Sequence, residues 1–143
     1  MLRECRDHTK EIRDIAFSKD MTMFITSSFD KTAMLWDFET MEVKKIYKIE
    51  RAVNAAAISP LKNHIMLGGG GEAVNVALTS GRLLKNEVNF FHMIHEELIG
   101  TVKGHFGPIN CLAFHPSGKG FASGSEDGYV RIHQLDEDYF DLE

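Results

Sequence analysis

Residues 8–37 read HTKEIRDIAFSKDMTMFITSSFDKTAMLWD, and residues 105–134 read HFGPINCLAFHPSGKGFASGSEDGYVRIHQ. The two stretches share landmarks at a constant separation of 97 positions: His8 with His105, Phe17 with Phe114, and Asp30 with Asp127. A fixed offset across several landmarks indicates an internal repeat, and a repeat decides the architecture before any single element does.

A third and weaker copy lies between these two. A shift of 41 positions carries Phe17 onto Ile58 and Leu35 onto Val76. The further step from Ile58 to Phe114 is 56 positions, so the middle copy holds about 15 additional residues. The shorter step falls within the roughly 40–45 residues of a four-stranded propeller blade.

Each full copy divides into short runs rich in β-branched and aromatic residues, separated by polar turns. The runs predict strands at residues 12–17, 23–28, 32–37 and 43–49 in the first copy, and at 109–114, 120–125 and 129–134 in the last. Runs such as AAAI and CLAF are apolar throughout, which is typical of a sheet covered on both faces. A single sheet cannot bury both of its faces, so each unit requires a neighbouring copy.

The composition favours a globular protein of a reducing compartment. The chain has 143 residues, of which 43% are hydrophobic, and a net charge of −5, which argues against a protein that binds a phosphate backbone. Cys5 and Cys111 show neither disulfide nor metal-ligand spacing. No apolar run approaches the roughly 18 residues of a membrane span, and the first residues are too charged for a secretory signal. We therefore expect a cytoplasmic protein.

The order His, strand, Ser or Thr, turn Asp and then Trp-Asp resembles the WD-repeat family, in which these side chains form a hydrogen-bonded network inside each blade. The last copy departs at His133, where the family has Trp, and the middle copy has Gly71 for Asp and Ala77 for Trp, with no matching His. We therefore expect packing alone to hold the middle blade. The resemblance assigns the network to His8, Thr26 or Ser28, Asp30 and Trp36 in the first copy, and to His105, Ser123 or Ser125, and Asp127 in the last.

A closer resemblance, to the i subunits of eukaryotic translation initiation factor 3, covers the chain from about His8 to Phe140. The segments KDMTMFITSS, LGGGGEA, EELIGTVKGHFGPIN and SGSEDGYVRIH carry it, and KGHFGPIN with EDGYVRIH is more specific than a generic blade. The resemblance implies a seven-bladed propeller, of which this chain would supply roughly the last three blades.

We therefore expect an all-β fold, a partial WD-repeat propeller of about three four-stranded antiparallel blades. The blades would cover about residues 8–48, 49–103 and 104–143, with the insertion of the middle blade near 79–92. Three blades do not close a ring, because propellers typically use about four to eight. We expect a fragment of a longer propeller, with two open flanks through which copies of the chain self-associate.

Three other patterns suggest chemistry, and each has a structural explanation. Ser, His and Asp in the first copy suggest a hydrolase, but the blade network uses the same residue types, and no G-x-S-x-G elbow is present. His92, His95 and Glu96 suggest a metal site, but strand positions three apart point to opposite faces. Residues 68–71 are four glycines without the Lys-Ser/Thr of a phosphate loop, and are expected where backbones approach closely. We expect no catalytic residue, no metal and no cofactor.

A small basic cluster is formed by Lys44, Lys45, Lys48 and Arg51. Apart from Tyr47 it has no aromatic neighbours on which bases could stack, so a solvated outer strand is favoured over contact with RNA.

A partner surface is expected at the top of the first two blades. There the first strand of a blade begins and the second-to-third turn returns, which places Asp14 and Asp30 near one rim, with Arg51, Asn54 and Glu72 beside them. A helix of another subunit that carries Arg or Tyr would bind this acidic notch through charge-assisted hydrogen bonds. For Asp30, a purely structural use inside its own blade is the alternative.

The resemblance implies a non-catalytic scaffold that holds the b and g subunits of the initiation factor, which assembles the small ribosomal subunit, initiator tRNA and mRNA. Contact with the ribosomal subunit would be indirect, and neither a membrane nor DNA is expected as a partner. Because a fold does not dictate a function, the alternative is another cytoplasmic WD-repeat adaptor, such as a signalling scaffold or a substrate receptor.

Overall fold

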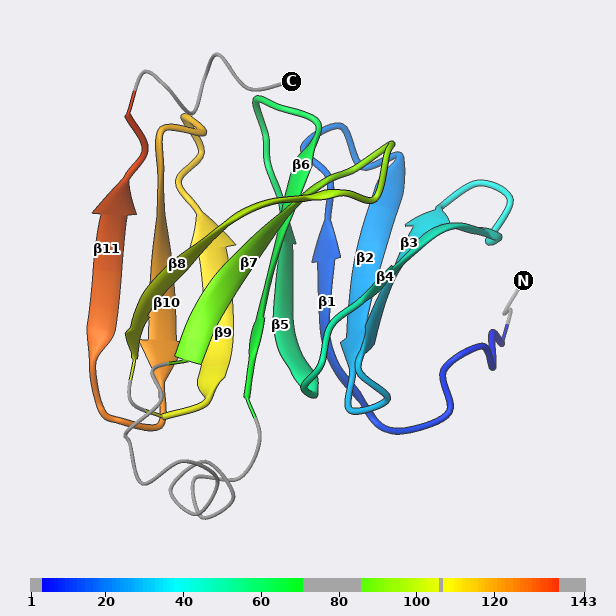
Figure 1. The fold of residues 1–143 in the computed structure, drawn as a ribbon. Coiled ribbons are helices and arrows are strands. Elements are labelled where there is room, and N and C mark those ends of the chain that lie inside the picture. The colour runs from blue at the N-terminus through cyan, green and yellow to red at the C-terminus, as the bar shows by residue number, and fades with distance from the viewer. Residues whose placement is uncertain (1–3, 71–85, 106, 137–143) are drawn as a thin grey trace.

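The computed structural model describes residues 4–70, 86–105 and 107–136, which form eleven strands in three antiparallel sheets (Figure 1). The first sheet, here the first blade, contains β1 (Ile12–Phe17), β2 (Met23–Ser28), β3 (Thr32–Asp37) and β4 (Val43–Lys48). The second blade contains β5 (Val53–Ile58), β6 (His64–Gly69), β7 (Asn86–His92) and β8 (Leu98–His105). The third blade contains β9 (Ile109–Phe114), β10 (Gly120–Ser125) and β11 (Val130–Gln134).

The all-β fold expected from the repeat is confirmed. All seven strands that the periodicity predicts in the first and last copies are present, with β4 and β11 each one residue shorter than expected. A fourth strand of the last blade would fall within residues 137–143, which lie outside the described residues. No helix among the described residues is long and apolar enough to cross a membrane.

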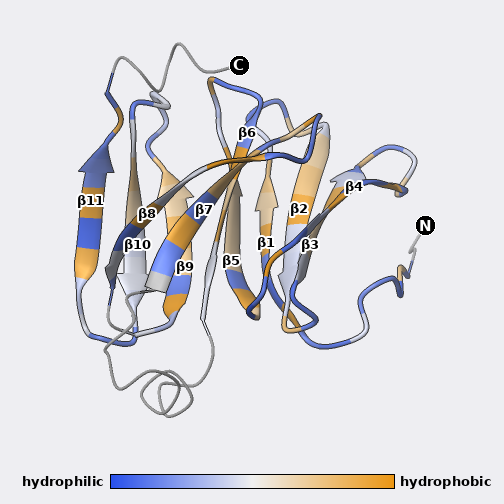
Figure 2. Ribbon diagram, viewed as in Figure 1, coloured by the Kyte–Doolittle hydropathy of each residue, from blue (hydrophilic) through white to orange (hydrophobic). Residues whose placement is uncertain are grey.

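The three sheets stand side by side, and their first strands β9, β5 and β1 form a row in the middle of the view, between β10 and β2 (Figure 1). Figure 2 shows the hydrophobic residues concentrated on the strands and the hydrophilic residues in the turns. One apolar core fills the space between the first and second blades, with Ile25, Leu35, Ile58 and Ile65 among its members. A second core, built around Phe90 and other residues of the second and third blades, joins those two sheets.

The strand pairing identifies equivalent positions in the three blades. Phe24 pairs with Trp36 across β2 and β3, and Ile65 pairs with Phe91 across β6 and β7. Ile65 follows Phe24 by 41 positions, whereas Phe91 follows Trp36 by 55. The additional residues of the second blade therefore lie between β6 and β7.

This register corrects the sequence alignment of the middle copy. Phe91, and not Ala77, occupies the position of the tryptophan, because Ala77 lies before β7 begins at Asn86. The insertion was expected near residues 79–92. The last seven of these positions, 86–92, form β7, and positions 79–85 lie outside the described residues. The strand NEVNFFH carries none of the family landmarks, so a constant offset misplaces it.

Polar contacts tie the first blade to the second beside the apolar core. The Asp14 carboxylate accepts a hydrogen bond from the backbone N–H of Ala56, at 3.2 Å, and another from Ile15. Burial raises the pKa of Asp14, and these two hydrogen bonds partly offset the rise. At the other side of the interface, the hydroxyl of buried Tyr47 donates to the carbonyl of Met93 at 2.6 Å.

Gly69 ends β6 at a point where two backbones nearly touch. A Cβ at this position would lie 1.9 Å from the carbonyl oxygen of Ala52 and 3.1 Å from the backbone nitrogen of Asn54. The expectation that the glycine run marks a close backbone approach is therefore confirmed at this residue.

Gly69→Ala is expected to destabilise the fold by about 3 kcal/mol, because the backbone of the β4–β5 connection must move to accept the methyl group. Gly100→Ala is the matched control, since a Cβ at Gly100 meets no atom within 4 Å. Urea unfolding followed by circular dichroism measures both. Equal midpoints for the two variants would contradict the close approach.

Candidate partner-binding site

The first blade contains a hydrogen-bonded network at the end of the sheet where β1 begins. His8 lies before β1, and its Nδ1 is 2.8 Å from Oδ2 of Asp30 in the β2–β3 turn. Its Nε2 is 2.7 Å from Oγ1 of Thr26 on β2. The indole N–H of Trp36 on β3 donates to the same hydroxyl at 3.0 Å. The structure thus brings together all four residue types that the family pattern predicts.

The carboxylate of Asp30 is fully committed inside this network. It accepts hydrogen bonds from the backbone N–H of Thr9 and Thr32 as well as from the Thr32 hydroxyl, and its side chain is only 7% exposed. Burial raises the pKa of Asp30, but hydrogen bonds from Thr32, His8 and Thr9 outweigh burial and lower it to about 2. Two roles were considered for Asp30, contact with a partner and a structural role inside its own blade. These hydrogen bonds support the structural role.

The third blade repeats the network with one substitution. Nδ1 of His105 is 3.0 Å from Oδ2 of Asp127, and its Nε2 is 2.8 Å from Oγ of Ser123. His133 stands where the first blade has tryptophan and stacks on Phe121, with ring centroids 4.7 Å apart and an interplanar angle of 20°. Burial lowers the pKa of His133, and the nearby charges of Arg131 and His105 lower it further.

The structure resolves which of two hydroxyl residues in each copy serves the histidine. Thr26 and Ser123 contact the histidine ring, whereas Ser28 and Ser125 hold the chain segment that leads into the first strand. The Ser28 hydroxyl donates to the carbonyl of Lys10, and the Ser125 hydroxyl lies 2.9 Å from the carbonyls of Gly107 and Pro108.

The second blade replaces the network by apolar side chains. Ile49 stands at the position of the histidine, Leu67 at that of the threonine and Phe91 at that of the tryptophan. Leu67 and Phe91 belong to the core between the first two blades, and partly buried Ile49 packs against it. The expectation that packing holds this blade agrees with these contacts, while Gly71, at the position of the aspartate, lies outside the described residues.

A pocket of about 560 Å³ opens beside these apolar side chains, which sequence reasoning did not foresee. Ile49, Phe91 and Leu98 provide its apolar surface, and Lys48 and Lys103 are among its charged residues. One sequence feature could have indicated this pocket: Ile49 stands where the first blade has a histidine. An isoleucine has no ring with which to bridge two strands by hydrogen bonds.

The Thr26–His8–Asp30 arrangement has the residue types of a nucleophile, a base and an orienting carboxylate, but it cannot receive a substrate. Thr26 is 3% exposed, and its oxygen already accepts the Trp36 N–H. A nucleophile requires an approach path for the reacting carbon, and here the indole and the sheet fill that space.

His92 and His95 lie closer than the sequence argument allowed. Their rings are 4.5 Å apart, because β7 ends at His92 and the chain turns, so that His92 Nδ1 accepts the N–H of His95. The expectation that these side chains diverge was wrong. Among the described residues, no group of three or more His, Cys, Asp or Glu side chains is arranged to hold a metal ion.

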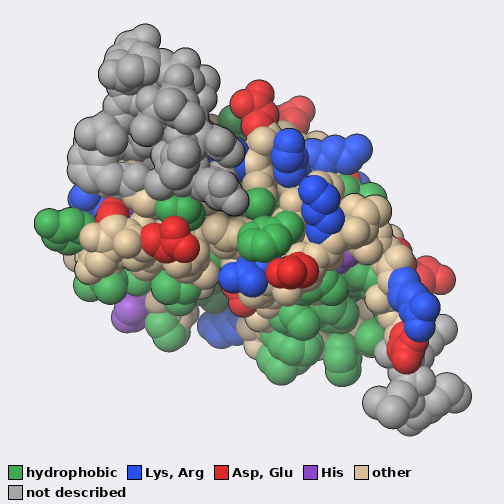
Figure 3. Space-filling model, turned by 90° about the horizontal axis from the view of Figure 1, so that it is seen from below, with side chains coloured by type: hydrophobic (Ala, Val, Ile, Leu, Met, Phe, Trp, Pro, Cys, Tyr) green, Lys and Arg blue, Asp and Glu red, His purple; other side chains and the backbone are tan. Residues whose placement is uncertain are grey.

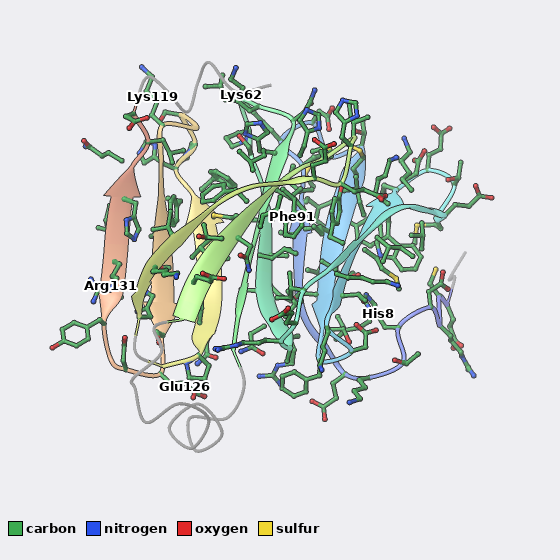
Figure 4. The ribbon with its side chains drawn as sticks, viewed as in Figure 1. His8, Lys62, Phe91, Lys119, Glu126 and Arg131 are labelled. Atoms are coloured by element: carbon green, nitrogen blue, oxygen red, sulfur yellow. The ribbon has the colours of Figure 1, made fainter. Side chains whose placement is uncertain are left out.

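The predicted partner surface is only partly available. Asp14 and Arg51 are half-buried at the rim, and Asn54 is 8% exposed with an Oδ1 atom that has no hydrogen-bond partner. Glu72 lies outside the described residues. Figure 4 places His8 and Glu126 toward the same end of the sheets, with Lys62 and Lys119 at the opposite end. The rim therefore brings together residues of successive blades, although Asp30 is not free to bind a partner.

The basic cluster is partly neutralised. Lys44 lies 3.7 Å from Asp37, and Lys45 lies 4.0 Å from Glu96, which agrees with a solvated outer strand.

Trp36→Ala is expected to lower the stability of the fold by about 3–5 kcal/mol, because Trp36 is 4% exposed and its loss leaves a cavity. His8→Ala and Asp30→Ala should each cost about 1–3 kcal/mol, since each leaves buried partners unsatisfied. Urea unfolding measures these values. Tyr129→Ala, at an exposed aromatic position, is the control, and equal midpoints in all four variants would contradict the network.

The stability of the fold should fall in acid partly through Asp30. Because its folded pKa of about 2 lies below the ordinary aspartate pKa of 3.8, the charged carboxylate stabilises the fold above about pH 4. This contribution is lost as the pH falls toward 2. Asp30→Asn should be less stable at neutral pH and should lose less stability between pH 4 and pH 2. Melting temperatures across this range measure the difference, and parallel curves for both proteins would contradict it.

Comparison with known proteins agrees with these features. The chain is 55% identical over 143 residues to "Eukaryotic translation initiation factor 3 subunit I" of Danio rerio and 54% identical over 143 residues to that of Homo sapiens. It is 54% identical over 140 residues to the subunit of Bombyx mori. The Danio rerio and Homo sapiens matches cover all of this chain and 44% of each relative, so the chain spans less than half the length of the relatives that it matches.

The family model "WD domain, G-beta repeat" matches residues 1–37 and 96–134, which together make up more than half of the chain. The matched ranges contain the two histidine networks and leave out most of the second blade, where the network is replaced by apolar packing. The chain therefore belongs to the WD-repeat family.

Proposed function

We propose that the protein is a non-catalytic scaffold subunit of translation initiation factor 3 that acts in the cytoplasm. The observation that carries this proposal is the identity of 54–55% across the whole chain to relatives named as subunit I of that factor. The buried polar networks support a scaffold role, because in both networked blades they hold strands together and present no reactive group to solvent.

The proposed partners are the b and g subunits of the factor. Their proposed docking surface is the rim formed by the first residues of β1, the β4–β5 connection and the first residues of β5, which contain Asp14, Arg51 and Asn54 respectively. The half-buried carboxylate of Asp14 favours a partner that presents donors, such as Arg or Tyr side chains on a helix.

Affinity purification of the tagged chain from a cell extract tests the assignment to the factor. Recovery of b and g subunits is expected, and recovery of a different protein assembly would favour the alternative WD-repeat adaptor. Binding of the purified chain to the purified b subunit then tests whether the contact is direct.

The residue test must separate binding from folding, because Asp14 also links the first two blades. Asp14→Asn removes the charge and keeps one carbonyl oxygen, which can still accept the N–H of Ala56, while the hydrogen bond from Ile15 to the second carboxylate oxygen is lost. Its affinity for the b subunit is expected to fall about 10-fold or more, since a charge-assisted hydrogen bond contributes about 1.5–3 kcal/mol.

Glu126→Gln is the matched control, because Glu126 is an exposed carboxylate at the same end of the third blade (Figure 4). Isothermal titration calorimetry measures both variants, and melting temperatures check the fold. Wild-type affinity in Asp14→Asn would place the contact elsewhere on the protein.

A further inference from the structure

The turn between β7 and β8 has a close counterpart in the turn between β3 and β4. The two turns read HMIHEE at residues 92–97 and DFETME at residues 37–42. In each, the N–H of the first residue donates to the carbonyl of the last, at 2.8 Å in the second blade and 3.0 Å in the first. The fifth residue has a positive φ in both, 60° for Glu96 and 59° for Met41. The two backbones therefore follow the same path and can be compared side chain by side chain.

The two turns differ in the side chain that holds them closed. In the first blade, Oδ1 of Asp37 accepts the N–H of Glu39, two positions later, at 3.0 Å. In the second blade, Nδ1 of His92 accepts the N–H of Ile94, also two positions later, at 3.2 Å, and that of His95 at 3.3 Å. A carboxylate is a permanent acceptor above about pH 4, whereas an imidazole nitrogen accepts only while it carries no proton. The second blade therefore closes the same turn with an acceptor that acid removes.

His92 is the middle member of a row of three imidazole rings. Its ring centroid lies 4.5 Å from that of His95 and 5.8 Å from that of His64, which is its partner across β6 and β7. His64 is fully buried, and burial lowers its pKa, while the nearby charges of His92 and Lys62 lower it further. A positive charge on one ring of the row therefore opposes a charge on the next.

The charged surroundings of the row do not compensate a proton on His92. Besides the row itself, the titratable and charged groups at this end of the second and third blades, among the described residues, are Lys62, Glu96, Glu97, His115, Lys119 and Asp136. Glu96 lies 4.0 Å from Lys45 of the first blade. Within the described part of the chain, no carboxylate forms an ion pair with His92.

The β7–β8 turn holds the outer strand of the first blade against the second blade. The carbonyl of Met93 accepts a hydrogen bond from the hydroxyl of Tyr47 at 2.6 Å, and Glu96 lies beside Lys45. Met93 is 7% exposed and belongs to the core between these two blades. Because Tyr47 and Lys45 both lie on β4, an opened turn gives up both contacts with that strand.

We propose that the β7–β8 turn is a pH-sensitive switch between the first two blades, which opens when His92 takes up a proton at Nδ1. A proton on this nitrogen confronts two N–H donors with a third donor, so the hydrogen bonds from Ile94 and His95 are lost. The closed turn binds only the neutral ring, whereas the open turn accepts either form, so acid shifts the population toward the open turn. Because histidine is the side chain whose charge ordinarily changes between about pH 5 and 8, the turn is closed at about pH 7.5 and opens as the pH falls toward about 5.5.

The switch lies away from the proposed docking rim. Figure 3 views the end of the sheets that carries the two histidine networks, where basic and acidic side chains are interspersed. Lys62 lies at the opposite end (Figure 4), next to Asn63, whose carbonyl accepts the N–H of Met93 in the β7–β8 turn. Measurements on the turn therefore test this proposal separately from binding at the rim.

Hydrogen–deuterium exchange of the purified chain measures the opening of the turn. Protection of the Ile94 and His95 amides, corrected for the intrinsic pH dependence of exchange, should fall about 10-fold or more between about pH 7.5 and 5.5. Nitrogen NMR of the isotope-labelled chain should show the His92 ring with its proton on Nε2 at the higher pH and with both nitrogens protonated in the opened state. Constant protection over this range would overturn the proposal.

His92→Asp gives the second blade the acceptor that the first blade uses. The turn of this variant should stay protected at about pH 5.5, because the carboxylate keeps its charge there. If this variant loses its native circular dichroism spectrum, His92→Asn supplies a neutral carbonyl oxygen and should remove the pH dependence in the same way. A pH dependence equal to that of the wild type would overturn the assignment to His92.

His64→Met is the matched control for the buried ring. It places at this position the residue type of the first blade, where Met23 pairs with Asp37 as His64 pairs with His92. The β7–β8 turn of this variant should still open in acid. Loss of the pH dependence would make the buried ring, and not His92, the responsive group, and would overturn the proposal.

Asp37→His tests whether a histidine at this position is sufficient. Protection of the Glu39 amide in the first blade should then become pH-dependent in the same direction, while the turn of the second blade responds as before. His115→Asn, at an exposed histidine of the β9–β10 turn, should leave both turns unchanged. A first-blade turn that stays closed in Asp37→His, or a second-blade turn that no longer responds in His115→Asn, would overturn the mechanism.

Discussion

A four-stranded sheet that is apolar on both faces must be covered on both faces, and the rest of this structure depends on that constraint. All six residues of β5 and all six of β6 are buried, so these two strands of the second blade expose neither face to water. Because the sheets must cover one another closely, small residues are required where they meet. A Cβ on Gly68 would lie 2.8 Å from Ile109 and 2.9 Å from Leu112 of the next blade. Close approach of the sheets lets apolar packing replace hydration over the whole interface.

Two different solutions stabilise the side of a blade that faces the preceding one. The first and third blades use a buried histidine that bridges the second strand and the following turn, which fixes geometry but requires every donor to be satisfied. The second blade uses Ile49, Leu67 and Phe91, which need no partners and so tolerate the loss of the turn aspartate. The pocket of about 560 Å³ lies beside two of these side chains, Ile49 and Phe91.

The sequence predicts the fold well wherever landmarks repeat. The strands of the first and third blades follow from alternation between turns, and the residues of both networks follow from the constant spacing of histidine and aspartate. β7 was misplaced because NEVNFFH lacks a tryptophan or aspartate, and only its pairing with β6 shows that Phe91 is the equivalent residue.

The partner surface was the least predictable feature, because it depends on what each carboxylate already binds. Asp14 and Asp30 look alike in sequence, yet one reaches the backbone of the next blade and the other accepts hydrogen bonds from three neighbouring residues of its own blade. The hydrogen bonds to Asp30 from His8 and Thr9 and to Asp14 from Ala56 join residues more than 20 positions apart, and no local pattern encodes them.

Every hydrogen-bonded strand pair in the three sheets joins strands that are consecutive along the chain. A blade can therefore form as soon as its own residues leave the ribosome, without waiting for distant sequence. At about 5–20 residues per second, the next unit of about 41 residues arrives roughly 2–8 s later. During that interval the newest sheet has one bare apolar face, so the order of synthesis sets a recurring window in which the nascent chain is prone to aggregation. The longer β6–β7 connection extends that window when the second blade is made.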